Sequence, residues 1–279
     1  MKGKLSKKQI KQYREEGYLN IPGFYDLKKE ILPIQRDIHR LIGLIIKAQE
    51  LGIKQEKFNP LTFDSGLNDI LHGHRELASV IYEAVKKLPS YVSLLTSKKH
   101  LDAAGAFLGS EFVGLANRGY GVRMDHPTED KYLTLWHQDY ITQLCAKSGV
   151  VFWSPLRAVT MDMGPVEFCP RSHRSGIFPV VCDGKGANAI KIKDEQKLVN
   201  KFKEKLQVEM KVGDMIAMDY LLLHRSIPNR GKYTRWGMIE RYFDFLDETG
   251  IGYGWKGGLQ EGTSFGTVHP DLYEEVKKV

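Results

Sequence analysis

Cysteines and long apolar runs are scarce in this 279-residue sequence, and each scarcity excludes a class of protein. The three cysteines are odd in number and lack paired spacing, so we expect reduced thiols with neither a disulfide framework nor a structural zinc site. No apolar stretch reaches the roughly 18 residues of a membrane span. The charged first residues are followed by further lysines rather than by an apolar signal region. We therefore expect a cytoplasmic protein with no membrane partner.

Concentrated charge is also absent, although the net charge is +7. A positive excess could favour an anionic small molecule or nucleic acid. The lysines, however, are scattered along the chain, and no segment combines basic with aromatic residues as nucleic-acid-binding surfaces do. We expect a small-molecule substrate, for which a negative charge is one option, and no nucleic-acid partner.

A dinucleotide-binding fold is excluded as well. Residues 252–257 formally match G-x-G-x-x-G, but no βαβ unit follows and little chain remains to build one. This motif lies in the glycine-rich residues 249–266, and a second unusual stretch, residues 183–205, is polar and rich in lysine. Either stretch could close over an active site as a lid, or be an ordinary surface insertion and a loose tail.

Helical signals dominate the first third of the chain. Ser6 and Gln9 have the spacing of a capping box, and Gly17 offers a stop signal. Asp26 precedes a long stretch in which apolar residues recur at helical spacing. Within that stretch, Pro33 either kinks a helix or marks its true start.

The character of the sequence changes near residue 105, where β-type patterns replace helical ones. Apolar runs separated by turn residues then occur at 150–153, 207–212, 215–223 and 236–245. Short strands of this kind are typical of sandwiches and jelly rolls. We expect one mainly β domain with flanking α-helices: a helical brace at residues 1–104, a double-stranded β-helix (jelly-roll, cupin-like) core at 105–248, and a tail at 249–279.

Three separated residues, His137, Asp139 and His224, form the strongest candidate site. The H-x-D pair lies among β-favouring residues, and the period of two in a strand would point both side chains to one face. Two imidazoles and one carboxylate form the facial triad of non-haem Fe(II) oxygenases, which leaves metal positions open. An H-x-D pair alone is common by chance, and the alternative for Asp139 is an exposed strand carboxylate or a turn partner.

Arg235 follows His224 at a distance that predicts a shared cavity. Residues 226–235 have the pattern of strand, turn and strand, with residues 229 and 230 as a two-residue loop. In that hairpin His224 would lie opposite Arg235, and directly paired residues share a face. The planar guanidinium could then hold a carboxylate bidentately. The alternative for Arg235 is a structural salt bridge.

Several segments resemble one known family. They are LWHQD at 135–139, VFWSPL at 151–156, GPVEFCPRSH at 164–173, HRS at 224–226 and GYLNIPGF at 17–24. With Arg235, they resemble the phytanoyl-CoA dioxygenase family of Fe(II)/2-oxoglutarate-dependent oxygenases. The sequence departs from the family at Arg171, where glycine is usual, which alters a turn outside the ligand set.

The resemblance implies cofactors and roles for particular residues. Iron would be held by His137, Asp139 and His224. Arg235 and Ser226 would bind the distal carboxylate of 2-oxoglutarate, and Trp153 would line the same pocket. With Fe(II), 2-oxoglutarate and O2, the expected reaction is hydroxylation of an unactivated C–H bond of a small molecule, with release of succinate and CO2. Desaturation and epimerisation remain open.

Two further questions stay open from the sequence. Arg123 and Asn117 belong to an expected strand before the H-x-D pair, and one of them could contact the substrate. His173 is close in sequence to the triad, but its turn context favours a hydrogen-bonding role over a metal-binding one. The alternative function is a non-redox jelly-roll protein that binds a metal or small molecule, whose signature would be a damaged triad or a missing carboxylate clamp.

Overall fold

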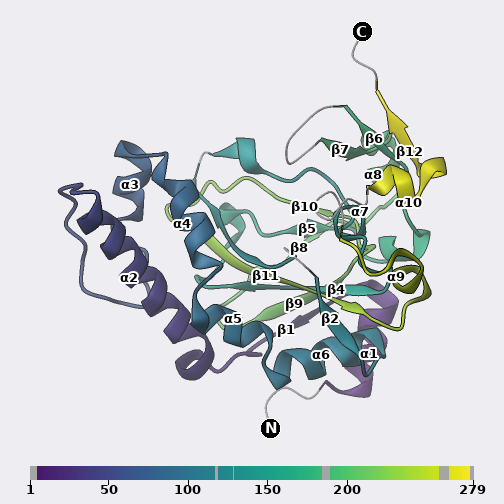
Figure 1. Cartoon of the computed structure of the whole chain (residues 1–279), viewed down its shortest axis with the longest axis horizontal. Helices are drawn as coiled ribbons and strands as arrows, with labels where there is room; N and C mark the ends of the chain where they lie inside the picture. The colour runs from purple at the N-terminus through teal and green to yellow at the C-terminus, as the bar shows by residue number, and fades with distance from the viewer. Residues whose placement is uncertain (1–4, 117–118, 128, 184–188, 258–263, 277–279) are drawn as a thin grey trace.

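The structure is a computed structural model that describes residues 5–116, 119–127, 129–183, 189–257 and 264–276 (Figure 1). Helices dominate the first part of the chain. The first part contains α1 (Lys7–Glu16), β1 (Tyr18–Ile21), the π-helix η1 (Leu27–Ile31), α2 (Leu32–Ala48), α3 (Leu67–Gly73), α4 (Leu77–Val85), α5 (Pro89–Leu95) and α6 (Lys98–Leu108). None of the helices in the described residues has the length and apolar character needed to cross a bilayer.

The local signals of the first helices act as predicted. The Ser6 side chain accepts from the backbone N–H of Gln9, whose own side chain accepts from the Ser6 N–H, which completes the capping box. Gly17 ends α1 in the left-handed conformation, with φ of 79°. Asp26 caps the single π-helical turn η1, and α2 begins after it with Pro33 in its first turn. Pro33 therefore marks a helix start, where its missing N–H costs nothing.

The strands form three sheets. The largest has the order β1, β9 (Met215–Asp219), β4 (Gly149–Pro155), β11 (Arg235–Asp244) and β2 (Val113–Leu115), and β3 (Gly121–Asp125) also pairs with β11. The second contains β10 (His224–Arg225), β5 (Glu167–Phe168) and β8 (Leu206–Gln207). The third contains β12 (Tyr273–Glu275), β6 (Val180–Cys182) and β7 (Ile190–Ile192). Every pair within the first two sheets is antiparallel.

Short helical elements connect and flank these sheets. They are η2 (Asp130–Tyr132), α7 (Tyr140–Gln143), η3 (Met161–Met163), η4 (Ser172–Ser175), α8 (Glu195–Val199), α9 (Glu248–Tyr253), α10 (Phe265–Val268) and η6 (Pro270–Leu272). β7 and α8 lie within the lysine-rich residues 183–205, while α9 and α10 lie within the carboxyl-terminal segment. The parallel pairing of β12 with β6 ties that segment to the third sheet.

The large sheet separates two apolar cores. Val150 and Phe152 of β4 belong to the core shared with the amino-terminal helices, whereas Val151 and Trp153 belong to the core on the other face. This alternation follows from the period of two in a strand. In Figure 1 the amino-terminal helices cover one side of the large sheet, and β10, β5 and β8 lie on its other side. The predicted fold class, a mainly β core braced by helices, is confirmed.

β11 carries the same alternation into the candidate site. Its even-numbered residues Trp236, Met238 and Tyr242 pack in the core beneath the helices. The odd-numbered residues Arg235, Ile239 and Arg241 line a cavity on the opposite face. One long strand therefore supplies side chains at several depths of one cup.

Candidate active site

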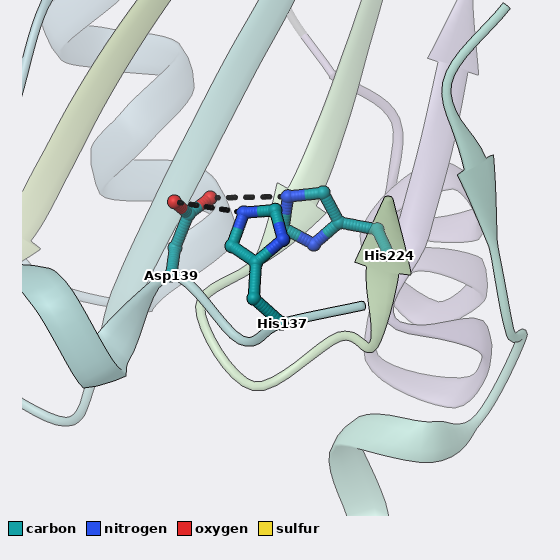
Figure 2. Close-up of side chains that lie close together, drawn as sticks. All are labelled: His137, Asp139 and His224. Carbon is teal, nitrogen blue, oxygen red and sulfur yellow. Dashed lines mark ion pairs between the residues drawn. The ribbon is translucent and has the colours of Figure 1, made fainter. Parts of the chain in front are cut away.

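His137, Asp139 and His224 meet in space. Their candidate ligand atoms all lie within 4.8 Å of one another (Figure 2). Asp139 Oδ1 lies 4.0 Å from His137 Nε2, and Asp139 Oδ2 lies 3.5 Å from His224 Nε2. In the described part of the chain this is the one group of three or more such side chains that could hold a metal ion.

The backbone that brings them together differs from the predicted strand. His137 and His224 form one antiparallel bridge, in which each N–H donates to the carbonyl of the other residue at 2.9 and 3.1 Å. Asp139 lies at the start of α7 with helical backbone angles, φ −62° and ψ −32°. The expectation that alternation along a strand aligns His137 with Asp139 was wrong. A bridge followed at once by a helical turn places both side chains at the site.

Hydrogen bonds fix the orientation of both imidazoles. Nδ1 of His137 lies 2.8 Å from the carbonyl of Leu135, and Nδ1 of His224 lies 2.9 Å from the carbonyl of Leu222. A carbonyl only accepts, so each Nδ1 carries the proton and each Nε2 keeps its lone pair. Figure 2 shows both rings beside the Asp139 carboxylate. This arrangement, in which the second ring nitrogen is anchored to the backbone, is typical of metal-binding histidines.

Asp139 presents one oxygen without a partner. Its Oδ1 accepts from Nε of Arg241 at 2.9 Å and lies 2.8 Å from Nη2 of the same residue. Its Oδ2 is buried and has no hydrogen-bond donor among the described residues. An unpaired buried carboxylate oxygen is costly, and a cation between it and the two imidazoles would remove that cost. The donor set of two nitrogens and one oxygen fits Fe(II).

The ionisation states also suit a cation. Burial, followed by the neighbouring His224, lowers the pKa of His137 to about 3. Burial alone would raise the pKa of Asp139, but the charge of Arg241 and the two imidazoles outweigh it and lower that pKa to about 2. At neutral pH the site therefore holds a neutral imidazole at His137 and an ionised carboxylate, the forms that bind metals.

The triad lines a cavity of about 50 Å³ together with most of the other predicted residues. These further lining residues are Arg123, Asp125, Thr134, Val151, Trp153, Val166, Met218, Arg225, Ser226, Arg235, Ile239 and Arg241. The hydroxyl of Ser226 lies 3.0 Å from that of Thr134. The structure thus brings Arg235, Ser226 and Trp153 into one cup with the triad. At this volume the cup has room for only a few water molecules.

Arg235 reaches the cup by another route than the predicted hairpin. It pairs with Asp125 of β3, whereas His224 pairs with Phe168 of β5. The two-residue turn was wrong because the buried Asn229 side chain organises a wider loop. That side chain donates to the carbonyls of Asp125 and Tyr233 and accepts from the Gly231 N–H. The loop belongs to neither strand and lets β10 and β11 enter different sheets.

The guanidinium of Arg235 is held by protein acceptors. Its Nε and Nη2 donate to Asp125 Oδ2 at 3.2 and 2.9 Å, and its Nη1 donates to the carbonyls of Met163 and Ile227 at 3.1 and 3.3 Å. Burial would raise the pKa of Asp125, but Arg123 and Arg235 together lower it. Asp125 was not singled out from the sequence. A carboxylate ligand must share Arg235 with it or displace it.

Arg123 and Asn117 are the two residues predicted as candidates for contact with the substrate. Arg123 donates to Asp125 Oδ1 at 2.7 Å, to the Thr134 hydroxyl at 2.9 Å and to the carbonyl of Tyr132 at 2.7 Å. All three nitrogens are therefore used, and two of them tie β3 to the segment before the triad. Contact with a substrate stays a prediction. Asn117 lies outside the described residues.

Two residues near the site have structural roles. His173 has the hydrogen-bonding role expected of it and is not part of the metal group. Its Nε2 lies 3.1 Å from the carbonyl of Arg14 in α1. Arg171 adopts a left-handed backbone with φ of 65°, which accounts for glycine at this position in the family. Its side chain forms ion pairs with Glu16 at 2.7 Å and Glu204 at 2.6 Å.

Arg241 is the functional candidate that the sequence reasoning missed. It is the partner of Asp139, and it lies on the same strand as Arg235 with an even spacing of six residues. Residues separated by an even number in a strand share a face. That parity was visible in the sequence and would have placed Arg241 in the cup.

Comparison with known proteins assigns the chain to a family. The sequence model described as phytanoyl-CoA dioxygenase (PhyH) matches residues 13–237. The chain belongs to the phytanoyl-CoA dioxygenase family. It is therefore an enzyme of an oxygenase family, and the match includes the whole triad and Arg235. None of the curated proteins is significantly similar to it in sequence.

Solved structures share the fold at low sequence identity. EctD from S. alaskensis, solved with bound Fe, is 15% identical with a TM-score of 0.60, over 99% of this chain and 82% of EctD. The epimerase SnoN, solved with Fe3+, alpha ketoglutarate and nogalamycin RO, is 15% identical with a TM-score of 0.56, over 92% of this chain and 91% of SnoN. AviO1 from Streptomyces viridochromogenes Tue57 is 18% identical with a TM-score of 0.55, over 86% and 95%.

Proposed function

We propose that this phytanoyl-CoA dioxygenase family member is an Fe(II)- and 2-oxoglutarate-dependent dioxygenase that hydroxylates a C–H bond of a small molecule and releases succinate and CO2. The observation that carries the proposal is the triad itself. The Nε2 atoms of His137 and His224 and the unpartnered Oδ2 of Asp139 lie close together in a buried cup. Three protein ligands of these types leave positions for a co-substrate and oxygen.

Iron would supply the oxygen chemistry when bound, and the chain's own residues would bind, orient and exclude water. Leu135 and Leu222 hold the two imidazoles through their carbonyls, so each ring offers one fixed nitrogen. The cup lies between the large sheet and strand β10 of the second sheet, and Val151, Trp153 and Ile239 are its apolar walls. Such walls keep bulk water from the reacting atoms.

Arg235 and Ser226 would bind the distal carboxylate of 2-oxoglutarate, with Trp153 as one wall of the pocket. Support comes from their position in the same cavity as the triad. Arg235 is only 2% exposed, so its charge acts in a poorly solvated environment where a carboxylate is held strongly.

An anionic substrate agrees with the charge of the cup. The arginines that line it are Arg123, Arg225, Arg235 and Arg241, against only Asp125 and Asp139. The carboxylate of Glu167 lies 2.6 Å from Nε of Arg225 and neutralises that arginine. The remaining arginines still outnumber the two aspartates, and a divalent metal would add further positive charge. A dicarboxylate co-substrate balances part of this charge. The remainder favours a substrate with a negative group.

One observation favours a second candidate function, a non-redox jelly-roll protein that binds a metal or small molecule. Asp125 already engages the guanidinium that would receive 2-oxoglutarate. If this ion pair does not yield, the cup could bind a metal without a co-substrate. The two candidates differ in whether 2-oxoglutarate binds next to the metal.

Anaerobic titration with Fe(II) and then 2-oxoglutarate tests the proposal. We expect a weak visible metal-to-ligand charge-transfer band, lost in His224→Ala and appearing only at higher 2-oxoglutarate concentration in Arg235→Ala. A metal that binds without any such band would favour the second candidate. Substrates can then be screened by stimulated succinate release. Mass spectrometry separates hydroxylation, which adds one oxygen atom, from desaturation or epimerisation.

A further inference from the structure

Arg241 has a direct connection to the candidate metal centre. It extends from β11 into the cup, where two of its nitrogens contact Oδ1 of Asp139 at 2.9 and 2.8 Å. Its third nitrogen, Nη1, donates to the carbonyl of Gly119 at 3.1 Å. The guanidinium is thus anchored at both ends and offers a rigid surface to the carboxylate.

The two carboxylate oxygens of Asp139 have different partners. Both nitrogens of Arg241 contact Oδ1, while Oδ2 is buried with no donor among the described residues and faces Nε2 of His224. Oδ1 also lies 4.0 Å from Nε2 of His137, but it is already occupied by two nitrogens of Arg241. Freeing Oδ1 to bind a metal would break these two charge-assisted contacts in a buried place. Such bonds are about twice as strong as neutral ones. Arg241 therefore fixes which oxygen the site presents.

The number of carboxylate oxygens matters because a carboxylate can bind a metal through one oxygen or through both. A second oxygen from Asp139 would take a metal position that the co-substrate needs. We propose that Arg241 is a positioning residue that restricts Asp139 to one-oxygen binding and so keeps a metal position open for 2-oxoglutarate. This inference rests on the proposed function and adds a residue to it.

Arg225 provides a matched comparison within the same cup. It also lines the cavity, but its Nε donates to Glu167 at 2.6 Å and its guanidinium lies 4.7 Å from the centre of the Trp136 ring. Arg225→Met removes a positive charge from the cup without removing a partner of Asp139. Arg241→Met removes the same charge and the partner together. A difference between the two variants therefore reports orientation rather than charge.

The test uses Co(II) as a probe in the full chain, because its visible ligand-field band weakens when the number of ligands rises. Arg241→Met should give a weaker Co(II) band, and 2-oxoglutarate should bind the Co(II)-loaded variant about tenfold or more weakly than wild type, as when outer partners of metal ligands are lost. Arg225→Met should keep the wild-type band and lose no more than about threefold in 2-oxoglutarate affinity. Calorimetry measures both affinities.

Three results would overturn the inference. An unchanged band with unchanged 2-oxoglutarate affinity in Arg241→Met is the first, and equal losses in Arg241→Met and Arg225→Met are the second. If Arg241→Met does not fold by circular dichroism, Arg241→Lys decides, because it keeps the charge on a single nitrogen and loses the planar fork. Arg241→Lys should weaken the Co(II) band and the 2-oxoglutarate affinity by less than Arg241→Met does. A band and an affinity equal to those of wild type are the third contradicting result. If wild type bound neither Co(II) nor 2-oxoglutarate, the proposed function itself would fail.

Discussion

The indole ring of Trp153 packs against the bare Cα of Gly237 on the neighbouring strand. A Cβ added at Gly237 would lie 2.8 Å from three ring atoms of Trp153, closer than non-bonded carbon atoms approach. The glycine therefore makes room for the tryptophan that walls the cup. Strand pairing sets this contact, since β4 and β11 are neighbours in the large sheet.

Gly237→Ala should displace the Trp153 ring and destabilise the protein by about 1–3 kcal/mol, the usual cost of overpacking. Urea unfolding measures the loss. Adding Trp153→Phe to Gly237→Ala replaces the indole by a smaller ring and should recover most of the lost stability. A double-mutant cycle measures this recovery. Gly252→Ala is the control, because a Cβ there meets no atom within 4 Å. Equal stability of the two alanine variants would contradict the packing argument.

Asp125→Asn should leave Arg123 and Arg235 without their shared counter-charge. Removing one partner of a buried ion pair typically costs about 3–5 kcal/mol. A carboxylate ligand of Arg235 would restore part of that loss, because the uncompensated charge favours an anion. We therefore expect 2-oxoglutarate to raise the melting temperature of metal-loaded Asp125→Asn by more than it raises that of wild type.

Thermal unfolding of both proteins, with and without 2-oxoglutarate, checks this expectation. Asp130→Asn is a matched control, since its carboxylate pairs with Arg230 on the surface. It should respond to 2-oxoglutarate as wild type does. A smaller ligand response in Asp125→Asn than in wild type would mean that Asp125 is needed to orient Arg235 for the ligand.

Glu240 should make the protein less stable as the pH rises. Its carboxyl group is fully buried, and neither oxygen has a partner among the described residues. Burial raises its pKa well above the ordinary value. A raised folded-state pKa gives full stability below the unfolded pKa, and that stability is lost as the pH rises toward the folded pKa, by about 1.4 kcal/mol per pH unit.

Glu240→Gln should remove this contribution and unfold at higher urea than wild type at pH 8, with the two proteins converging near pH 4. Urea unfolding across this range measures the difference. Glu111→Gln, at an exposed glutamate, should change stability by less than about 0.5 kcal/mol at either pH. A difference between Glu240→Gln and wild type that does not grow with pH would show that Glu240 is ionised in the fold.

Arg171 allows backbone strain to be separated from ion pairing. Its left-handed φ of 65° disfavours any residue with a Cβ, while its side chain pairs with Glu16 and Glu204. Arg171→Ala loses the ion pairs and keeps the strain, whereas Arg171→Gly loses both. We expect the glycine variant to melt at a higher temperature than the alanine variant. The reverse order would mean that the turn is not strained.

The sequence predicted the members of the site better than their local geometry. The helix signals at Ser6, Gly17 and Pro33 depend on neighbouring residues, so the sequence contains all the information needed. His137 and Asp139 were assigned to a strand because the flanking residues favour one. In the structure, His137 instead forms a single bridge with the distant His224, and a helical turn begins at Tyr140.

Long-range pairing also explains why the surroundings of Arg235 differ from the prediction. Asp125 lies 110 residues before its partner Arg235, and no local pattern connects the two. The hairpin after His224 was predicted from turn residues alone, whereas the Asn229 side chain bonds to β3 and widens the loop. Arg241 is a different case, because its parity with Arg235 within one strand was available from the sequence.

A crystal structure of the anaerobic Fe(II) and 2-oxoglutarate complex would locate the metal through the anomalous signal of iron. We expect one strong peak bounded by Nε2 of His137, Nε2 of His224 and Oδ2 of Asp139, with the distal carboxylate of 2-oxoglutarate on Arg235 and Ser226. An iron peak away from these three atoms, or 2-oxoglutarate bound without contact to the guanidinium of Arg235, would contradict this assignment.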